Sequence, residues 1–462
     1  IGLAFATKVL KCVTLYYARI EFAKVEVFHE KIHAVRGHSV AAMMGMSIYI
    51  LADTYFIATY AGSNGLAVLN LVIPLYGVMN AVGAMIGIGS ATRYSIRKAR
   101  GKDVRSFFLQ SLFWIALASI PFMIGGLLFP RNLLALLGAN RALQDLGIPY
   151  LRCILPFAFF YMASYATGAF VRNDNNPSIA MIGSVSASLF NIVFDYIFMF
   201  PLKMGMAGAA LATGISPVLS SVICLFHFCS KKNTIPFAWQ TPRLKHFCAC
   251  CQLGLSNFIS EMASSVTIAT FNFLILNLAG NTGVASYGVI TNVSSVCNAM
   301  FNGLAQGAQP LMSQSYGKKD VKTLQKYLKY GIFTALCFSV LIVFLVNFQS
   351  NFFIGLFNSE NSQGLYDYAK QGIRLYFWAF FFVGINTLLV SYFSATNNPK
   401  PAFTVSLVRG TFAIVFFAVL LSSLWKMNGI WLAYPFSEFV TLFLVLFNYR
   451  KEKASARFEK NI

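Results

Sequence analysis

The chain has 462 residues, of which 57% are hydrophobic and only 11% are charged. A soluble domain of average composition carries about 25% charged residues, so the composition excludes a chain of two or three ordinary soluble domains. The net charge of +21 could suggest a nucleic-acid partner. We expect none, because the positions of the basic residues along the chain explain the charge.

Twelve apolar stretches follow one another along the sequence. About 20 apolar residues are enough to cross a hydrocarbon core of ~30 Å as a helix, and backbone groups in lipid must be satisfied within the segment. The sequence therefore predicts an all-α polytopic membrane protein. The expected transmembrane helices are 38–60, 66–92, 106–129, 146–170, 179–200, 206–229, 248–279, 284–310, 327–348, 366–395, 402–424 and 428–449.

The basic residues are concentrated on one side of the predicted membrane segments. Six of them lie between Arg93 and Arg105, after the second span, and others follow the sixth and eighth spans. With the N-terminus in the cytoplasm, most of the 36 Lys and Arg residues fall in the termini and the cytoplasmic loops, as the positive-inside rule requires. We therefore expect a multi-pass protein of the plasma membrane with both termini cytoplasmic.

The two halves of the chain resemble each other. Ala61–Ala67 aligns with Ala279–Ala285, and Asn175–Pro177 aligns with Asn397–Pro399 at nearly the same offset along the chain. An ordered series of such matches at nearly constant spacing indicates an internal repeat. Each repeat contains six spans, so both halves have the same orientation, as in transporters built from parallel repeats.

The repeat predicts the domain organisation and a mode of action. Two similar bundles that meet at an interface form a cavity that can open to either side, which suits alternating access. The expected domains are a basic N-terminal lead (1–37), an N-lobe with helices 1–6 (38–229), a cytoplasmic linker (230–247), a C-lobe with helices 7–12 (248–450) and a cytoplasmic tail (451–462).

Four acidic residues lie inside predicted spans, where a charge is costly and a functional role is the default expectation. They are Asp53, Asp195, Glu261 and Glu438. Asn191 lies four residues before Asp195, so the two share a helix face and could hold a proton or help to bind Na⁺. A structural hydrogen bond inside the bundle is the alternative role for each acid.

Three residues are candidates for a substrate cavity. Tyr161 and Tyr165 share one helix face and could stack on a flat cation, although packing is the commoner role of such aromatic residues. Glu438 lies ten residues into the last predicted span and is the third candidate.

Two features raise the question of metal binding. The nine cysteines show no disulfide framework, and only His246 lies near the cluster Cys248–Cys251, whereas a zinc site needs four ligands in a defined arrangement. We expect free thiols there. Residues 29–33 read His-Glu-Lys-Ile-His, which is the helical zinc motif of metalloproteases, with Glu30 as general base. A third ligand could come only from His38, and no catalytic domain surrounds the motif, so a metalloprotease stays a remote alternative.

Several motifs resemble those of the multidrug and toxic-compound extrusion (MATE) family of transporters. They extend over residues 38–450 and comprise Ala52–Ile57, Asn191–Asp195, Gly208–Thr213 and Gln306–Pro310. The resemblance implies a V-shaped exporter with twelve helices, driven by the inward flow of H⁺ or Na⁺, and not an enzyme.

The resemblance also implies a set of ion-coupling residues. In relatives with a cation site in the N-terminal lobe, an Asp on the first helix joins an Asn and an Asp on the fifth and a Thr on the sixth. The matching residues are Asp53, Asn191, Asp195 and Thr213. Many members also use an acid on the seventh helix, which Glu261 matches. An acid found on the tenth helix in some members is missing here, and the nearest polar residues are Asn386 and Thr387, which leaves coupling in the C-lobe open.

The function that these observations favour is a cation-coupled antiporter that exports lipophilic organic cations. We expect no cofactor besides H⁺ or Na⁺ as the coupling ion, and we expect a monomer whose partners are small organic cations and membrane lipids. Two alternatives stay open. A lipid or glycolipid flippase of a related fold would share the architecture, and a channel would need a charged or carbonyl-lined pore, for which the sequence shows no filter.

Overall fold

The computed structural model describes residues 26–458 apart from 138, 140, 239 and 358–361. Within this range, the side chains of residues 26–48, 50, 51, 58, 62–64, 66, 67, 70, 142, 281, 356, 357 and 453–458 are also outside the description. The described residues form helices and connecting turns, and no strand occurs among them. The predicted all-α class is therefore confirmed for the described part of the chain.

The first half of the chain forms a bundle that we call the N-lobe. Its α5 and α6 are joined by a 3₁₀ turn (η1, Leu155–Phe157), and a second 3₁₀ turn (η2, Phe226–Cys229) follows the last helix. The helices of the N-lobe are α2 (Glu26–Ala99), α3 (Phe107–Leu128), α4 (Pro130–Leu136), α5 (Arg141–Ile154), α6 (Ala158–Asn173), α7 (Pro177–Met199) and α8 (Met206–Leu225).

The second half forms the C-lobe. A 3₁₀ turn (η3, Phe377–Ala379) joins α12 to α13, and a π-helical turn (η4, Val408–Ala413) joins α14 to α15. The helices of the C-lobe are α9 (Leu244–Gly317), α10 (Val321–Phe348), α11 (Ser350–Phe357), α12 (Gln363–Tyr376), α13 (Phe380–Ala395), α14 (Pro399–Leu407) and α15 (Ile414–Phe458).

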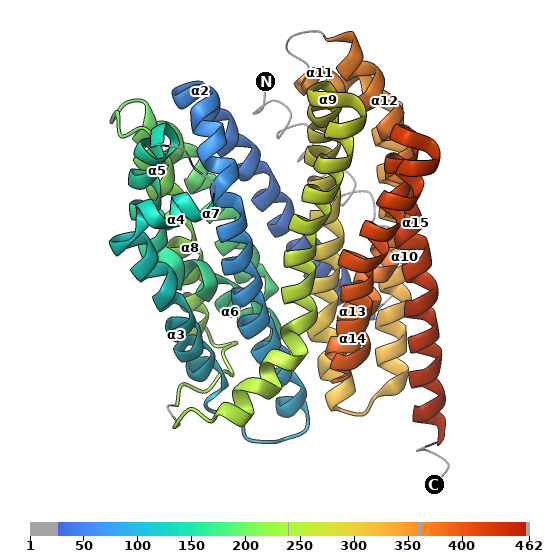
Figure 1. The fold of residues 1–462 in the computed structure, drawn as a ribbon. Coiled ribbons are helices and arrows are strands. Elements are labelled where there is room, and N and C mark those ends of the chain that lie inside the picture. The colour runs from blue at the N-terminus through green and yellow to red at the C-terminus, as the bar shows by residue number, and fades with distance from the viewer. Residues whose placement is uncertain (1–25, 138, 140, 239, 358–361, 459–462) are drawn as a thin grey trace.

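The longest helical elements fold back on themselves. Helix α9 has a non-helical residue at Gly280 (φ 62°, ψ −156°), and its two arms run in opposite directions in Figure 1. In α2, both Tyr49 and Asn80 lie next to Tyr161 in the wall of one cavity. In a straight helix these two residues would be about 46 Å apart, so α2 also reverses direction. Each of these elements therefore supplies two membrane crossings.

Backbone conformation repeats between the lobes. Positive φ angles occur at Gly101 (66°) and Lys319 (60°), and at Asn175 (62°) and Asn397 (57°). Each pair lies at the offset at which the surrounding sequences of the two halves align. The left-handed conformation is costly for most residues other than glycine, so its recurrence at lysine and asparagine in equivalent turns supports the internal repeat independently of sequence identity.

The helices account for the predicted membrane spans. Nine described helical segments are long and apolar enough to cross a membrane. Together they hold ten of the predicted spans, because Pro399–Glu452 contains two of them and is kinked at Trp425 and Lys426. The predicted spans 38–60 and 284–310 are helical as well. The second of these carries several Asn, Ser and Gln residues, which lower its hydropathy.

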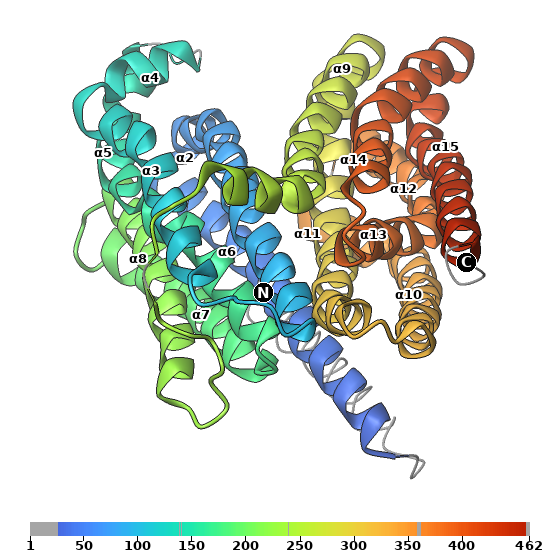
Figure 2. The ribbon, with the colours of Figure 1, turned by 90° about the horizontal axis from the view of Figure 1, so that it is seen from below.

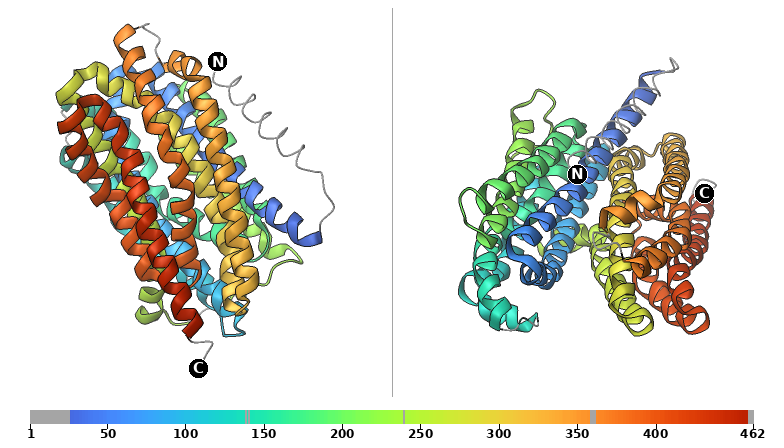
Figure 3. Two further views of the ribbon diagram at one scale, coloured as in Figure 1. Left: turned by 90° about the vertical axis from the view of Figure 1, so that its right-hand side faces the viewer. Right: turned by 90° about the horizontal axis from the view of Figure 1, so that it is seen from above.

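The two lobes lie side by side and diverge toward one end (Figure 1). Each has its own apolar core, with Tyr150 and Met162 buried in the N-lobe and Trp431 and Phe380 buried in the C-lobe. Seen from below, the segment between α8 and α9 passes beneath the N-lobe before it enters the C-lobe (Figure 2). The first turns of α2 project away from both bundles (Figure 3).

Candidate functional site

The Asp53 carboxyl on α2 and the Asp195 carboxyl on α7 lie against each other inside the N-lobe, close enough to share a hydrogen bond when one of them carries a proton. Asp53 is 7% exposed and Asp195 is 0% exposed. Asn191, one turn before Asp195, donates a hydrogen bond from Nδ2 to Oγ1 of Thr213 on α8 at 3.1 Å. The structure therefore brings together the four residues predicted for the N-lobe coupling site.

This cluster contains buried oxygen atoms that lack a partner. Among the described residues, none hydrogen-bonds Asp53 Oδ1, Asn191 Oδ1, Asp195 Oδ1 or Asp195 Oδ2. In the same part of the chain, no Lys, Arg or His forms a salt bridge with either carboxyl. A buried acceptor without a hydrogen bond costs free energy, so the cluster is incomplete without a proton or a cation.

The chemistry of these oxygens suits a small cation. Two adjacent carboxyls repel each other when both are ionised. A proton on one of them, or a cation between them, relieves this repulsion. Carboxylate and amide oxygens are also the ligands that hard cations take in proteins. The cluster can therefore accept H⁺ or Na⁺.

A cavity that is partly open to solvent lies next to this cluster. Tyr161 and Tyr165 of α6 line it, and so does Thr213, the residue bonded to Asn191. Thr213 thus belongs to both the cavity wall and the carboxyl cluster. Much of the remaining wall carries hydroxyl groups, from Ser164, Ser184, Ser188, Ser216 and Ser220.

Glu261 lies across the interface, on α9 of the C-lobe. Its carboxyl interacts electrostatically with the hydroxyl groups of Tyr161 and Tyr165. Gln306, from the second arm of α9, lines the same cavity. The cavity is therefore lined by residues of both lobes, and the structure places Glu261 near Tyr161 and Tyr165 of the cavity wall rather than in the Asp53–Asp195 cluster.

Glu438 lies elsewhere, in the interior of the C-lobe, where it is 2% exposed. Its carboxylate accepts a charge-assisted hydrogen bond from Arg409 Nε at 2.6 Å and a second bond from Asn386 Nδ2 at 2.8 Å. Arg409 also donates from Nη1 to Oγ1 of Thr387 at 2.9 Å. The structure thus holds Glu438 in an internal ion pair and does not place it on the described wall of the N-lobe cavity.

Sequence reasoning missed Arg409. The residue lies in the predicted span 402–424, in the π-helical turn η4, and such turns are frequent at functional sites. An arginine inside an apolar span was a sufficient signal, because intramembrane charges normally have a partner. Asn386 and Thr387, which stand where some relatives have an acid, complete its cluster.

The lobes touch at one end of the molecule, which we call the narrow end. There Ser313 of α9 donates a hydrogen bond to Ser95 of α2 at 2.9 Å, and Gly317 packs so closely on Ala99 that a Cβ atom would lie 2.4 Å from the Ala99 Cβ. Ser95 and Ser313 occupy equivalent positions in the two repeats. The axis that relates the two lobes therefore passes between them, and the lobes spread apart toward the other end (Figure 1).

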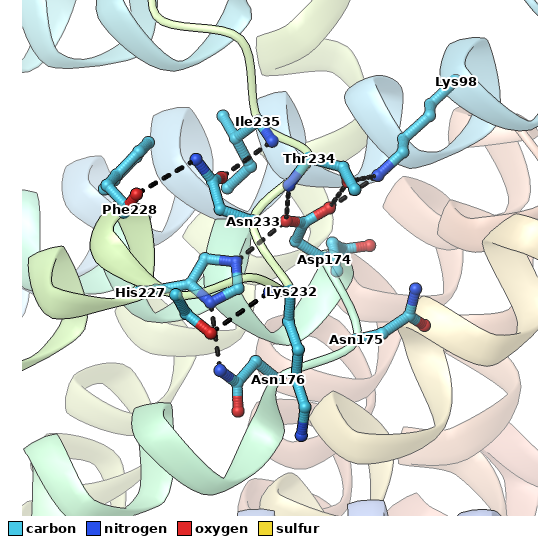
Figure 4. A network of polar contacts seen from close by, with 12 residues as sticks. Lys98, Asp174, Asn175, Asn176, His227, Phe228, Lys232, Asn233, Thr234 and Ile235 are labelled. Atoms are coloured by element: carbon cyan, nitrogen blue, oxygen red, sulfur yellow. Dashed lines mark hydrogen bonds and ion pairs between the residues drawn. The ribbon is translucent and has the colours of Figure 1, made fainter.

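A buried polar network fastens the interlobe segment to the narrow end of the N-lobe (Figure 4). Asp174, between α6 and α7, accepts hydrogen bonds from Lys98 Nζ at 2.5 Å, His227 Nε2 at 2.8 Å and the main-chain N–H of Thr234 at 2.7 Å. Burial raises the pKa of Asp174, but the hydrogen bonds from His227, Lys98 and Thr234 outweigh it and lower this pKa to about 2. Asp174 therefore stays ionised and joins three segments.

The HEKIH motif gives no support to a metal site. Its side chains lie outside the described residues, and its backbone belongs to the helical start of α2. Across the described ranges, no group of three or more His, Cys, Asp or Glu residues is arranged to hold a metal ion. The eight cysteines in those ranges are free.

Two parallel helical repeats define a two-lobed membrane carrier. The N-lobe contains a cavity, which Gln306 of the C-lobe also lines, and a buried carboxyl pair. The family model MatE matches residues 39–197 and 258–420, which cover both repeats. The chain belongs to the MatE family of membrane transporters. Family membership confirms the resemblance found in the sequence and makes the protein a multi-pass transporter rather than an enzyme.

Curated relatives match over nearly the whole chain. The multidrug export protein MepA of Staphylococcus saprophyticus is 24% identical over 423 residues, which cover 90% of each chain. The MepA protein of Staphylococcus haemolyticus is 24% identical over 435 residues, which cover 92% of this chain and 94% of the relative.

Solved structures show the same fold. A MATE crystallised in complex with MaL6 superposes with a TM-score of 0.87 at 20% identity, covering 92% of this chain and 96% of that one. An outward-facing multidrug resistance MATE transporter of the MOP superfamily superposes with a TM-score of 0.85 at 20% identity, covering 94% and 100%. The predicted architecture of twelve helices in two bundles is therefore confirmed.

Proposed function

We propose that this protein exports organic compounds and is driven by the inward flow of H⁺ or Na⁺ through its N-lobe. The observation that carries the proposal is the Asp53–Asp195 pair, whose buried oxygens lack a partner among the described residues. The curated relatives named multidrug export proteins support export of several compounds rather than one metabolite.

The narrow end is proposed to face the cytoplasm. The loop after α2, which holds Arg100, Lys102 and Arg105, lies beside this end, and basic loops stay on the cytoplasmic side. In this orientation the described state is closed toward the cytoplasm and spreads toward the outside. A coupling ion then reaches the carboxyl pair from outside while the substrate leaves.

The geometry gives exchange between ion and substrate a physical basis. A proton or Na⁺ on the carboxyl pair changes the charge of the cluster that includes Asn191 and Thr213. Because Thr213 also lines the cavity, binding of the ion changes the electrostatic potential at the cavity wall. A cationic compound that is stabilised by the ionised pair is therefore released when the ion binds, and it binds again after the ion has left.

Reconstitution tests this proposal. Purified protein in liposomes should accumulate a lipophilic fluorescent cation when a ΔpH or a Na⁺ gradient is imposed, and dissipating both gradients should stop accumulation. Asp195→Asn and Asp53→Asn should abolish gradient-driven transport while leaving insertion intact. Asp103→Asn, at a carboxyl that is 46% exposed outside the membrane segments, is the matched control. Full coupled transport by both membrane variants would refute the N-lobe site and make Glu261 the leading candidate.

A further inference from the structure

Arg172 extends into the N-lobe cavity from the last turn of α6. It shares a helix face with Tyr161, Tyr165 and Gly168, at spacings of eleven, seven and four residues, and all four line the cavity. The Arg172 Nη1 atom lies 3.4 Å from the position that a Cβ atom on Gly168 would occupy. The guanidinium therefore folds back over the preceding turn, toward the membrane interior, instead of extending to the aqueous end of the helix.

This position is not explained by the helix itself. A cation in the last turn of a helix interacts favourably with the helix dipole, but a guanidinium that points outward into water has the same benefit. The equivalent position in the C-lobe repeat holds Ser394, whose hydroxyl lies 3.1 Å from the hydroxyl of Ser256. The fold therefore does not require an arginine at this position.

Arg172 and Arg409 differ in their partners. Arg409 has the Glu438 carboxylate at 2.6 Å. Arg172 forms no salt bridge and no hydrogen bond with any residue that the structure describes. Arginine stays charged in proteins, and a charge within a membrane segment normally pairs with another group. The missing partner of Arg172 must therefore come from outside the described chain.

The cavity wall offers both hydrogen-bond donors and acceptors to a ligand. Tyr165 and Ser220 line the cavity, and neither hydroxyl donates a hydrogen bond to a described residue, so both can donate to a ligand. In contrast, Ser188 and Ser216 donate to main-chain carbonyls of their own helices at 3.0 and 2.7 Å, so they present oxygen lone pairs. An oxyanion suits the first group, and a cation suits the second.

We propose that Arg172 binds the carboxylate of a zwitterionic substrate, whose cationic part faces the acceptor-lined region beside Thr213. Guanidinium–carboxylate pairs are short and can be bidentate, which gives them both strength and geometric specificity. The inference rests on the proposed export function and adds a specificity-determining residue to it, namely the arginine that would bind a substrate carboxylate in the cavity.

A matched pair of dyes tests the inference. Rhodamine B carries a free benzoate, and its ethyl ester has the same cationic ring system without the negative charge. Fluorescence polarisation with purified protein in detergent measures equilibrium binding of both dyes and needs no ion gradient. The native protein should prefer the acid. Arg172→Gln should weaken binding of the acid by about tenfold or more, as expected for loss of a charge-assisted pair, and should change ester binding by less than about twofold.

Two further variants separate the carboxylate site from general damage. Gly168→Leu retains Arg172 but fills the space under its guanidinium, so it should reproduce the selective loss of the acid. Arg152→Gln removes an exposed arginine of α5, on the same apolar segment, and should leave both affinities unchanged.

Three outcomes would overturn the inference. The inference fails if native protein binds the acid no better than the ester. It also fails if Arg172→Gln weakens binding of the acid and of the ester equally, because the arginine then does not bind the carboxylate. An effect that appears only with phosphatidylglycerol in the micelles, and not with phosphatidylcholine, would assign Arg172 to a lipid phosphate. Selective binding without gradient-driven uptake in liposomes would instead refute the export proposal and leave the carboxylate site standing.

Discussion

The two lobes share an architecture, but their buried acidic residues have different partners. In the N-lobe, Asp53 and Asp195 lie together without a cationic partner among the described residues. In the C-lobe, Glu438 is neutralised by Arg409 and also bonded by Asn386. One lobe therefore contains a site that is complete only with a bound ion, and the other contains a site that the protein completes itself.

The repeat shows where this difference arises. When the two halves are aligned on their repeat, Asn386, Arg409 and Glu438 correspond to Ser164, Ala187 and Pro217. The three N-lobe residues line the open cavity. Their C-lobe counterparts instead fill the equivalent space with an ion pair. Because a paired charge needs no exchange with solvent, this difference supports the proposed coupling through the N-lobe rather than through the C-lobe.

The strongest test substitutes one acid from each lobe. Asp195→Asn should reduce gradient-driven transport by at least about 100-fold, since the remaining carboxyl can no longer exchange a proton or cation in the pair. Glu438→Gln should retain coupling, with the same dependence on ΔpH or Na⁺ as the native protein, because its carboxylate carries a fixed partner. Initial uptake rates in liposomes measure both. Loss of coupling in Glu438→Gln would show that the C-lobe acid also takes part in coupling and that the two lobes do not differ in this respect.

A second test addresses what the lobes share, the contact on their common axis. Oxidised Ser95→Cys/Ser313→Cys should form a disulfide, because the native hydroxyls are 2.9 Å apart and a disulfide spans a similarly short separation of side chains. The crosslink should stop transport, and a reductant should restore it. The two single cysteine variants, treated with the same oxidant, control for the free thiols of the native chain. Undiminished transport by the crosslinked protein would show that the narrow end does not open.

A third test concerns the stability of the C-lobe pair. Arg409→Met leaves the Glu438 carboxylate, 2% exposed, without its cation, and breaking a buried pair in this way costs about 3–5 kcal/mol. The double variant Arg409→Met/Glu438→Gln removes the orphan charge and should recover most of the loss. Thermal unfolding of purified protein measures both. A double variant as unstable as the single one would show that the arginine acts through packing rather than through charge.

The spans, the repeat and the face shared by Asn191 and Asp195 could be predicted from the sequence, for identifiable reasons. Hydropathy marks apolar helices, and Asn191 and Asp195 share a face by spacing alone. The approach of Asp53 to Asp195 did not follow from spacing, and it was reached only through the family resemblance.

The remaining site residues depend on contacts between helices. Arg409 meets Glu438 across 29 positions in the chain, and a hydropathy window that averages along one helix cannot show such a pair. Arg172 follows the predicted span 146–170 by two residues, so the sequence places it in a basic loop. Only the direction of its side chain over Gly168 moves it into the cavity.

The smallest expected effect lies at the narrow end, where the lobes differ again. Asp174 corresponds to Thr396 in the C-lobe, an uncharged residue whose hydroxyl bonds carbonyls of its own helix at 3.0 and 3.2 Å. Asp174 instead carries a charge that Lys98 pairs at 2.5 Å. Its pKa falls from 3.8 to about 2, so the ionised form stabilises the folded state.

The sign of the pH dependence follows from this lowered pKa. The stabilisation is fully present above pH ~4, where the unfolded chain is also ionised, and it is lost as the pH falls toward ~2. A shift of this size corresponds to roughly 2 kcal/mol.

Asp174→Asn should therefore be less stable than the native protein at pH 7 by about this amount, and the difference should shrink as the pH falls below ~4. Trypsin cleavage at the exposed Lys231 and Lys232, in the segment that Asp174 holds through Thr234, reports the same loss locally at pH 7. Thr404→Val removes a C-lobe hydroxyl that bonds the Lys400 carbonyl of its own helix at 3.0 Å; it is the control and should show no such pH dependence. A stability difference between Asp174→Asn and native protein that is constant from pH 7 to pH 3 would show that the network acts through shape rather than charge.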